Sequence, residues 1–403
     1  MKDIAEQIKA YNSSRIPEIL ELKYKAMRED KYRFYRAIPH VLYGDIPKNS
    51  FLFDAPNAWL CGDLHLENLG SYKADNRLTY FGVNDFDECI LGSFFIDISR
   101  MLTSIYVSAD GLKLNVRDAD SLCKVFTGAY FNGLKQGYIR ELEAETTTGI
   151  MRDFLEKVQK RKRKDFLEKK TSKKKILIDG THTVQIPGKE KNKVTEHIKK
   201  WAKGTSNPEF YNVLDVTFRI AGTSSLGLNR YAVLVEGRGG YDGRFLLDLK
   251  ETLPSCLGGI IKTKQPNWKT EADRIVEVQK RTLSAPPALL ASINIDKKNY
   301  VLKELQPVAD RIHYPLFAGS TKKLKTILEQ MGSICAWSNL RGAGRDNSAI
   351  ADELIEFATK NEKLSKELMD NAYKTLKTTT DYYKTYCAAY DKGFFKTSKK
   401  NKY

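Results

Sequence analysis

The spacing of apolar residues divides the chain into helical, sheet-rich and helical stretches. Residues 1 to about 50 carry apolar side chains at intervals of three and four, which is typical of amphipathic helices. The same spacing returns from Phe94 to Tyr138, and again from about Thr321 onward. Alternating patterns predict short strands at residues 58–62 and 78–84.

From about Asn207 the chain has the alternation of a β-sheet. DVTFRIAGTSSLGLNRYAVLVEG predicts strand, glycine-bounded loop and strand, and GGYDGRFLLDLKE predicts a turn and a third strand. A helix, TEADRIVEVQKRTLS, precedes two further strands in LLASINI and NYVLKEL, and KILIDGTHTVQIPG upstream predicts a hairpin. We expect an α+β fold in which 207–306 form a β-rich lobe. Residues 1–206, with a basic insert near 157–175, and 307–403 then form a helical lobe.

Charge and composition limit the range of partners. The 403 residues carry a net charge of +17, and more than half of this excess lies in Lys157–Lys175, where eleven Lys and Arg face Asp165 and Glu168. Such a segment is usually a solvated helix or loop, and sometimes a site for an anionic partner. No zinc-finger or RNP signature accompanies it, so no sequence-specific recognition of nucleic acid is expected.

Cysteine usage and hydropathy bear on location. The six cysteines are scattered without a C-x-x-C pair, which predicts free thiols in a reducing compartment. The chain has no apolar run long enough for a transmembrane helix, and MKDIAEQIKAYNSSRIPEIL lacks the apolar centre of a signal peptide. We therefore expect a cytoplasmic protein without a membrane span.

Two short stretches gather carboxylates in this basic chain, 61-CGDLHLENLG-70 and 83-VNDFDECILG-92. Apolar residues interleave with the acidic ones, unlike in a solvated acidic face. Asp63 and Asn68 are five residues apart, and Asp85 follows Asn68 after seventeen more. Oxygen ligands at these spacings suit Mg²⁺ that bridges substrate phosphates, and Asp87, on the strand face of Asp85, is the alternative ligand. Asp97, in the next helix, is expected to brace the loop that holds Asp63.

Two other interpretations of the acidic residues stay open. They could form a structural turn that caps nearby helices. They could also belong to a metallophosphatase, because Asp63-Leu64-His65 matches the D-x-H that opens such two-metal sites. That fold needs several further histidines, and the whole chain has only five.

The β-rich stretch contains a candidate phosphate-binding loop. It runs through Gly222, Thr223, Ser224, Ser225, Leu226 and Gly227. Glycines let backbone N–H groups approach phosphates, although a plain hairpin loop has the same composition. Lys250 ends the third strand and Glu277 lies in the next helix. A strand lysine that binds nucleotide phosphates and is held by a helical glutamate is the arrangement of a protein-kinase small lobe.

The order of these segments is unusual for a kinase. Ordinary kinases place the nucleotide lobe before the catalytic loop, but here only 62 residues precede Asp63, and they have a helical pattern. We therefore expect a circularly permuted, protein-kinase-like two-lobe fold, with the catalytic-loop segment first and the nucleotide-binding lobe later. Backbone groups of Val301–Leu305 would contact the adenine base.

The same segments resemble a known family. CGDLHLENLG, NDFDE and DISRMLTS resemble the hallmark of the bacterial domain-of-unknown-function family 2252, and RIAGTSSLGLNRYAVLVEG, LLDLKE and NYVLKEL resemble its later blocks. The resemblance implies a protein-kinase-like protein, akin to aminoglycoside and other small-molecule phosphotransferases. Three positions depart from the family pattern: Ser224 replaces the middle glycine of its G-V-G-S-V-G loop, Leu69 a phenylalanine and Ala37 a glycine.

The sequence thus predicts a phosphotransferase that uses ATP and Mg²⁺ on an unidentified acceptor. Asp63 would orient or deprotonate the acceptor hydroxyl, and Asn68 and Asp85 would carry Mg²⁺. Lys250, oriented by Glu277, would hold the α- and β-phosphates. Two alternatives stay open: transfer of AMP from a nucleotide bound in the reverse direction, and a nucleotide-binding pseudokinase that serves as a scaffold for an anionic partner.

Overall fold

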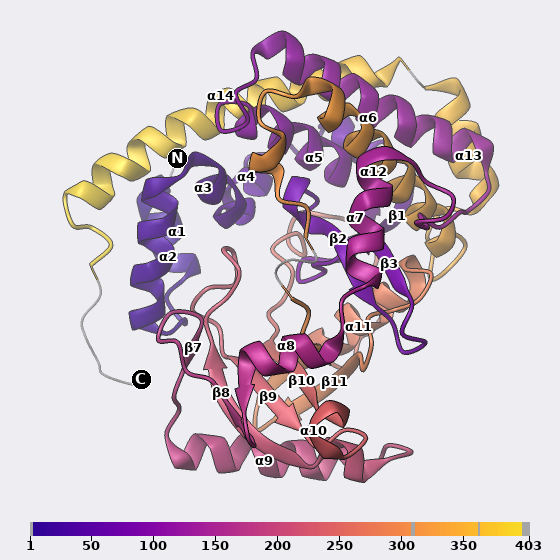
Figure 1. Ribbon diagram of the computed structural model, residues 1–403. Coiled ribbons are helices and arrows are strands. Elements are labelled where there is room, and N and C mark those ends of the chain that lie inside the picture. The colour runs from indigo at the N-terminus through magenta and orange to yellow at the C-terminus, as the bar shows by residue number, and fades with distance from the viewer. Residues whose placement is uncertain (1–2, 308–310, 362, 397–403) are drawn as a thin grey trace.

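The chain forms a helical region and a region built on an antiparallel sheet, so the fold is α+β (Figure 1). The computed structural model describes residues 3–307, 311–361 and 363–396. Within these ranges no helix is long and apolar enough to cross a membrane. All six cysteines are free thiols, as their spacing predicts.

The N-terminal segment is helical, as predicted. Pro17 and Pro39 lie in the first turn of their helices, where the N–H group that proline lacks would have no partner inside the helix. Asp3 and Asp30 accept backbone N–H groups at two other helix starts. The helices are α1 (Ile4–Tyr11), α2 (Pro17–Glu29), α3 (Lys31–Ala37) and α4 (Pro39–Gly44).

Two small antiparallel ribbons carry the acidic stretches. They pair β1 (Asn57–Leu60) with β4 (Ile90–Ser93) and β2 (Leu69–Lys73) with β3 (Thr79–Val83). The strands predicted at 58–62 and 78–84 are therefore confirmed to within two residues. Asp63 follows β1 and Asp85 follows β3, so each acidic loop leaves the end of a ribbon.

Five long helices build the main core. They are α5 (Phe95–Ser108), α6 (Val116–Gln136), α12 (Thr321–Gly342), α13 (Ala351–Lys360) and α14 (Leu364–Asp391). Their apolar side chains join those of both ribbons in one cluster, so the last quarter of the chain completes the lobe that the first part begins. α6 and α12 pack closely because Gly332 has no side chain; a Cβ there would lie 2.4 Å from the carbonyl oxygen of Phe126.

The other lobe is a six-stranded sheet. The strands are β7 (Thr183–Val184), β8 (Val213–Arg219), β9 (Arg230–Val235), β10 (Phe245–Glu251), β11 (Ala291–Ile295) and β12 (Lys298–Glu304). Their order is β11-β12-β10-β9-β8-β7, with every neighbouring pair antiparallel. α11 (Glu271–Thr282) follows the third predicted strand, so the predicted succession of strands and helix is confirmed.

The two faces of the sheet differ because side chains alternate along each strand. One face is apolar and packs on α9 (Gly188–Ala202) through Val194 and Ile198. The other packs partly on α8 (Arg163–Lys170), where Leu167 meets Ala232 and Leu234. Beyond α8 this second face carries Arg219, Arg230, Asp248, Lys250 and Lys303, which line a cleft.

Two sequence expectations for the region before the sheet are wrong. The predicted hairpin does not form, because β6 (Lys175–Ile176) pairs with β5 (Thr171–Ser172) and β7 pairs with β8. Asp179 accepts three N–H groups between them and turns the chain away. The predicted lobe boundary at 207 also falls too late, because β7 and α9 already belong to the sheet.

The basic insert consists of short elements beside the sheet. α7 (Gly149–Gln159) precedes α8, and α10 (Gly240–Gly243) lies close to α8. Arg163 stacks over the Phe245 ring at 4.1 Å and donates to the Asp242 carbonyl, so it is anchored to the sheet lobe. Most other lysines and arginines of the insert are exposed, as a solvated segment predicts.

Candidate active site

The acidic loops and the glycine-bounded loop line one cleft between the two lobes. The cleft encloses about 1000 Å³, counting the part open to solvent. Its walls include these predicted residues: Asp63, Asn68, Asp85, Asp87, Gly222, Thr223, Ser224, Ser225 and Lys250. Segments more than 150 positions apart in the sequence therefore meet at one place.

The loop that presents Asp63 is held by backbone contacts. Asp97 accepts the N–H groups of Cys61 at 2.9 Å and Gly62 at 3.0 Å, so its predicted bracing role is confirmed. Gly62 has φ +79°, and a Cβ there would lie 1.9 Å from the carbonyl oxygen of Glu88. Only glycine fits this turn. Burial raises the pKa of Asp97 to about 6, against the two N–H groups that favour its carboxylate.

Asp63 is fixed on one side and faces the cleft on the other. The Nε of Arg100 donates to its Oδ1 at 2.8 Å, and 14% of its side chain is exposed. Burial raises the pKa of Asp63, and the guanidinium of Arg100 opposes that rise. A carboxylate oriented through one oxygen can accept a hydrogen bond from an acceptor hydroxyl with the other.

Asn68 ties the two acidic loops together. Its Nδ2 donates to the carbonyl oxygens of Asp63 at 2.9 Å and Asp85 at 3.1 Å, while its Oδ1 accepts the N–H of Asp85 at 2.7 Å. Both ends of the amide are therefore engaged. The amide oxygen keeps a second lone pair, so Asn68 can add one metal bond to its structural role.

Lys250 contacts the other two predicted metal ligands. Its Nζ lies 3.3 Å from Oδ1 of Asp85 and also pairs with Oδ2 of Asp87. The surrounding protein partly desolvates the carboxylate of Asp85, but the charges of Lys250, Lys303 and Arg230 outweigh this effect and hold its pKa below the usual value. Burial and the charge of Asp85 raise the pKa of Asp87. The cation between the two carboxylates thus keeps at least Asp85 ionised.

This donor set fits Mg²⁺. Among the described residues, no group of three or more His, Cys, Asp or Glu side chains is placed to hold a metal ion. Mg²⁺ does not need one, because it is usually held by one or two carboxylates, with waters and substrate phosphates as the other ligands. Asp85 is 53% exposed and turns its carboxylate to the cleft, so it and Asp87 can serve a metal that arrives with phosphates.

The predicted partner of Lys250 is wrong. Glu277 lies on another side of α11 and pairs with Lys280 at 3.0 Å. Ile275 and Gln279, one helical turn apart, are the α11 residues that line the cleft. Gln279 is 2% exposed, and its Oε1 is buried without a hydrogen-bond partner among the described residues. Helical periodicity with Ile275 and Val278 in the core would have favoured Gln279 over Glu277.

The glycine-bounded loop is anchored by residues that the sequence did not point to. The carbonyl oxygen of Ser224 accepts from Lys23 at 2.8 Å and from Arg15, and that of Leu226 accepts from Arg15 at 2.9 Å. Lys23 is fully buried, and burial holds its pKa well below the usual value. Because these carbonyls turn toward the N-terminal segment, their hydrogen bonds to Arg15 and Lys23 hold the loop in place. No local motif marks Arg15 or Lys23.

A second missed set lies on the sheet face of the cleft. Asp248 pairs with Arg219 at 3.0 Å and with Arg230 through two contacts. The two guanidinium groups outweigh burial and lower the pKa of Asp248. Lys303 lies nearby, and burial lowers its pKa to about 8. The alternation of Asp248 and Lys250 on one strand face indicates this position, but the arginine partners come from other strands.

The backbone expected to contact adenine lies inside the sheet. β12 lies between β10 and β11, so Val301 pairs with both neighbours. The N–H groups of Glu304 and Leu305 donate to the carbonyls of Ala288 and Leu246, both at 2.8 Å. The contact of Val301–Leu305 with an adenine base stays a prediction, and the paired N–H groups of Glu304 and Leu305 argue against it.

His65 does not have the surroundings of a metal ligand. Its Nε2 lies 3.1 Å from Nε of Arg36 and its Nδ1 lies 3.1 Å from the backbone N of Glu67, and the neutral ring can accept at one of these nitrogens. Burial and the charges of Arg36 and Arg100 hold its pKa well below the usual value. The D-x-H motif is thus part of the loop packing, which argues against a two-metal phosphatase site.

The bracing role of Asp97 predicts a large cost for its removal. Asp97→Ala would leave two buried N–H groups without a charged acceptor, and such bonds are worth about 1.5–3 kcal/mol each. We expect urea denaturation to show a loss of roughly 3 kcal/mol or more in the free energy of unfolding, and hydrogen exchange to accelerate at Cys61 and Gly62. The matched control is Ser104→Ala, which removes a neutral acceptor from Leu66 in the same loop. A cost no greater than that of the control, about 1 kcal/mol, would contradict the bracing role.

Comparison with known proteins places the chain in a family. The family model described as "Uncharacterized protein conserved in bacteria (DUF2252)" matches residues 15–389. No curated protein and no solved structure matches the chain. The matched range covers the helical lobe, the sheet and the cleft between them. The chain therefore belongs to the DUF2252 family.

Proposed function

We propose that this protein is an ATP- and Mg²⁺-dependent phosphotransferase with a circularly permuted, protein-kinase-like fold. The observation that carries the proposal is the contact of Lys250 with Asp87 and with Asp85, which lies 165 positions earlier in the sequence. It joins a strand lysine beside a glycine-bounded loop to a pair of carboxylates next to Asp63. These are the parts that phosphoryl transfer requires, because it depends on positioning and charge neutralisation.

Each residue then has a defined task. Asp63, oriented by Arg100, accepts the proton of the acceptor hydroxyl as the oxygen attacks the γ-phosphorus and the bond to the β-phosphate oxygen breaks. Lys250 holds the phosphates, and the glycine-bounded loop covers them. Asp85 and Asp87, with the free lone pair of Asn68, would hold Mg²⁺, which neutralises the developing charge. The site of the acceptor is the outer part of the cleft beside Asp63.

Spatial arrangement favours the kinase-like interpretation despite the chain order. The succession β8, loop, β9, β10, α11, β11 and β12 matches that of a kinase small lobe with a lysine on the third strand. The acidic loops that carry Asp63 and Asp85 come earlier in the chain, but they line the same cleft as the sheet. A site depends on where its groups lie and not on their order in the chain, so permutation would leave the chemistry intact.

Nucleotide binding is the first test. We expect ATP with Mg²⁺ at about 100 times its dissociation constant to stabilise the wild type by roughly 2.7 kcal/mol, seen as a rise of the thermal midpoint. Lys250→Ala and Asp85→Ala should lose this rise relative to their own midpoints. EDTA should reduce the ATP-dependent rise in the wild type. It removes Mg²⁺, so the phosphates would be repelled by the carboxylates of Asp85 and Asp87.

Glu277→Gln is the matched control, because Glu277 pairs with Lys280 outside the cleft. It should keep the full ATP-dependent rise. A folded wild type without a shift at millimolar ATP would refute the nucleotide site. A loss of the shift in Glu277→Gln would instead restore Glu277 as the partner of Lys250.

A second candidate function, transfer of AMP, is favoured by the sheet face of the cleft. An adenine base prefers apolar walls, but this face carries the Arg219–Asp248–Arg230 ion group and Lys303. The backbone N–H groups of Glu304 and Leu305 are also already paired. Cations at this depth suit phosphates, so a reversed nucleotide would place its triphosphate inward and its base outward. Product analysis separates the two functions: ADP supports phosphoryl transfer and pyrophosphate supports AMP transfer.

The reversed orientation predicts a pH dependence of binding. Burial lowers the pKa of Lys303 to about 8. Phosphates against Lys303 would favour its protonated form, so ATP–Mg²⁺ affinity should fall as pH rises through 8, by up to about tenfold per unit. Calorimetric titrations between pH 7 and 9.5 measure this fall.

The control for this pH dependence is Lys303→Arg, which keeps its charge at every pH and should flatten the profile. If the base lies against Lys303, deprotonation would not weaken binding. A flat wild-type profile would therefore contradict the reversed orientation.

A further inference from the structure

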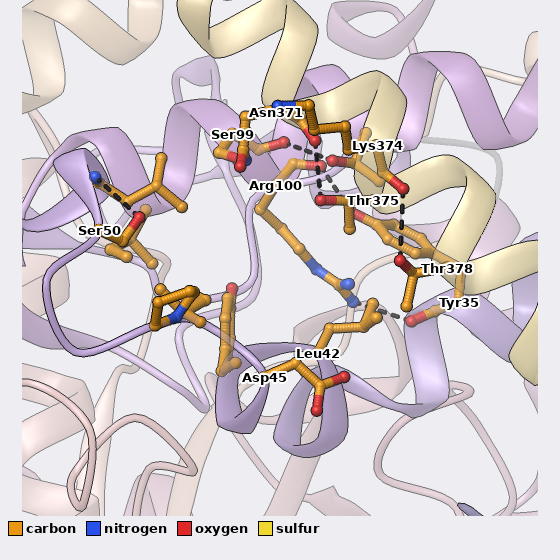
Figure 2. A pocket seen from close by; sticks show the side chains of 16 residues that line it. Tyr35, Leu42, Asp45, Ser50, Ser99, Arg100, Asn371, Lys374, Thr375 and Thr378 are labelled. Atoms are coloured by element: carbon orange, nitrogen blue, oxygen red, sulfur yellow. Dashed lines mark hydrogen bonds between the residues drawn. The ribbon is translucent and has the colours of Figure 1, made fainter.

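A second cavity lies on the opposite side of Arg100 from the cleft. It encloses about 710 Å³, counting open solvent, and we call it the rear pocket. Its walls come from α3 and α4, the following loop, α5 and α14, so it lies within the helical lobe (Figure 2). None of its lining residues belongs to the sheet. It therefore cannot be a part of the nucleotide cleft.

Arg100 connects the rear pocket with the cleft. Its Nε donates to Asp63 at 2.8 Å, and its Nη2 donates to the carbonyl oxygen of Tyr35 at 3.0 Å. Its Nη1 is buried without a hydrogen-bond partner among the described residues, although only 4% of the residue is exposed. Figure 2 shows the guanidinium among the side chains that line the pocket. A buried donor on a charged group is costly unless an acceptor reaches it.

The remaining walls indicate what kind of acceptor fits. Lys374 adds a second cation to the wall, and the residue is exposed to solvent. Asp45 is the one acidic wall residue there, and its carboxylate already accepts from Tyr382 at 2.8 Å. Leu42 and Leu52 supply an apolar part. Two cations and an apolar part in the walls of one cavity suit a small acid with a short hydrocarbon body.

We propose that the rear pocket binds a small organic acid, whose anionic group accepts from Nη1 of Arg100 and pairs with Lys374. The existing bonds of Arg100 need not break, because a guanidinium has five donors and Nη1 is the unused one. Thr375 donates its hydroxyl to the carbonyl oxygen of Asn371 at 2.9 Å and Thr378 donates to that of Lys374 at 3.4 Å, so both hydroxyl oxygens keep their lone pairs. They give the site polar walls without adding negative charge.

Binding there would be felt at Asp63, a consequence that rests on the proposed function. The anionic group of the occupant and the carboxylate of Asp63 would share the guanidinium of Arg100. The occupant would therefore weaken the ion pair between Arg100 and Asp63 and make the Asp63 carboxylate a better proton acceptor. The pocket would thus regulate the transferase without touching its substrates. Binding itself requires no catalytic activity, so it is tested separately.

The experiment uses butyrate as the probe and the thermal midpoint as the readout, with sodium chloride at equal ionic strength as the reference. We expect a saturable rise in the wild type, with acetate binding several-fold more weakly because it lacks the hydrocarbon body. Lys374→Glu should weaken the butyrate affinity at least tenfold. Lys377→Glu, the same charge reversal one turn along α14 and outside the pocket walls, should leave it within twofold.

Crystals soaked in 4-bromobutyrate locate the site directly. Anomalous scattering should place the bromine between α4 and α14. Bromine found only beside Lys250, no butyrate effect in the wild type, or equal effects in both lysine variants would each overturn the proposal. Lys250→Ala should keep the butyrate response, so loss of the nucleotide site and loss of the rear-pocket site are distinguishable outcomes.

Discussion

The cleft depends on one cation between two carboxylates. Two unit charges 4 Å apart interact with about 4 kcal/mol at an effective dielectric constant of 20, so Asp85 and Asp87 would repel each other strongly without Lys250. Lys250 holds the sheet lobe against the acidic loops and keeps Asp85 ionised. A ligand can enter this arrangement at low cost only if it brings both signs of charge. A metal bound to phosphates does so, because the metal takes over the carboxylates and the phosphates take over Lys250.

The N-terminal helices supply a second tie between the lobes. Arg15 and Lys23 donate hydrogen bonds to backbone carbonyls of the glycine-bounded loop, while α1 and α2 pack with α14 of the helical lobe. The loop is therefore positioned by a segment outside the sheet. This bears on Ser224, which stands where the family resemblance leads us to expect a glycine. Its carbonyl is the one that both cations hold, so the loop gains a fixed shape where a glycine would add freedom.

Much of the fold could be predicted because it follows local patterns. The helical segments, the strands of the sheet and the bracing Asp97 all follow from periodicity and spacing within short windows. The errors concern partners chosen by distant segments. Glu277 was expected at Lys250, but the rotation of α11 turns Gln279 to the cleft. The hairpin predicted near residue 180 does not form, because β6 pairs with β5 and β7 pairs with β8. Arg15, Arg100 and Lys23 act through contacts that no local pattern encodes.

The ionic sheet face separates the two candidate functions on physical grounds. An adenine base placed against Asp248 would have to displace Arg219 or Arg230, and breaking a buried ion pair costs about 3–5 kcal/mol. Otherwise the base would cover these charged side chains and remove their hydration without replacing it. A phosphate at the same place would keep the guanidinium groups paired and add charge-assisted hydrogen bonds. In the proposed function, the same Asp63, Asp85 and Lys250 would serve either direction of the nucleotide. Under this proposal, the choice of the transferred group would depend on the sheet face of the cleft and not on Asp63, Asp85 and Lys250.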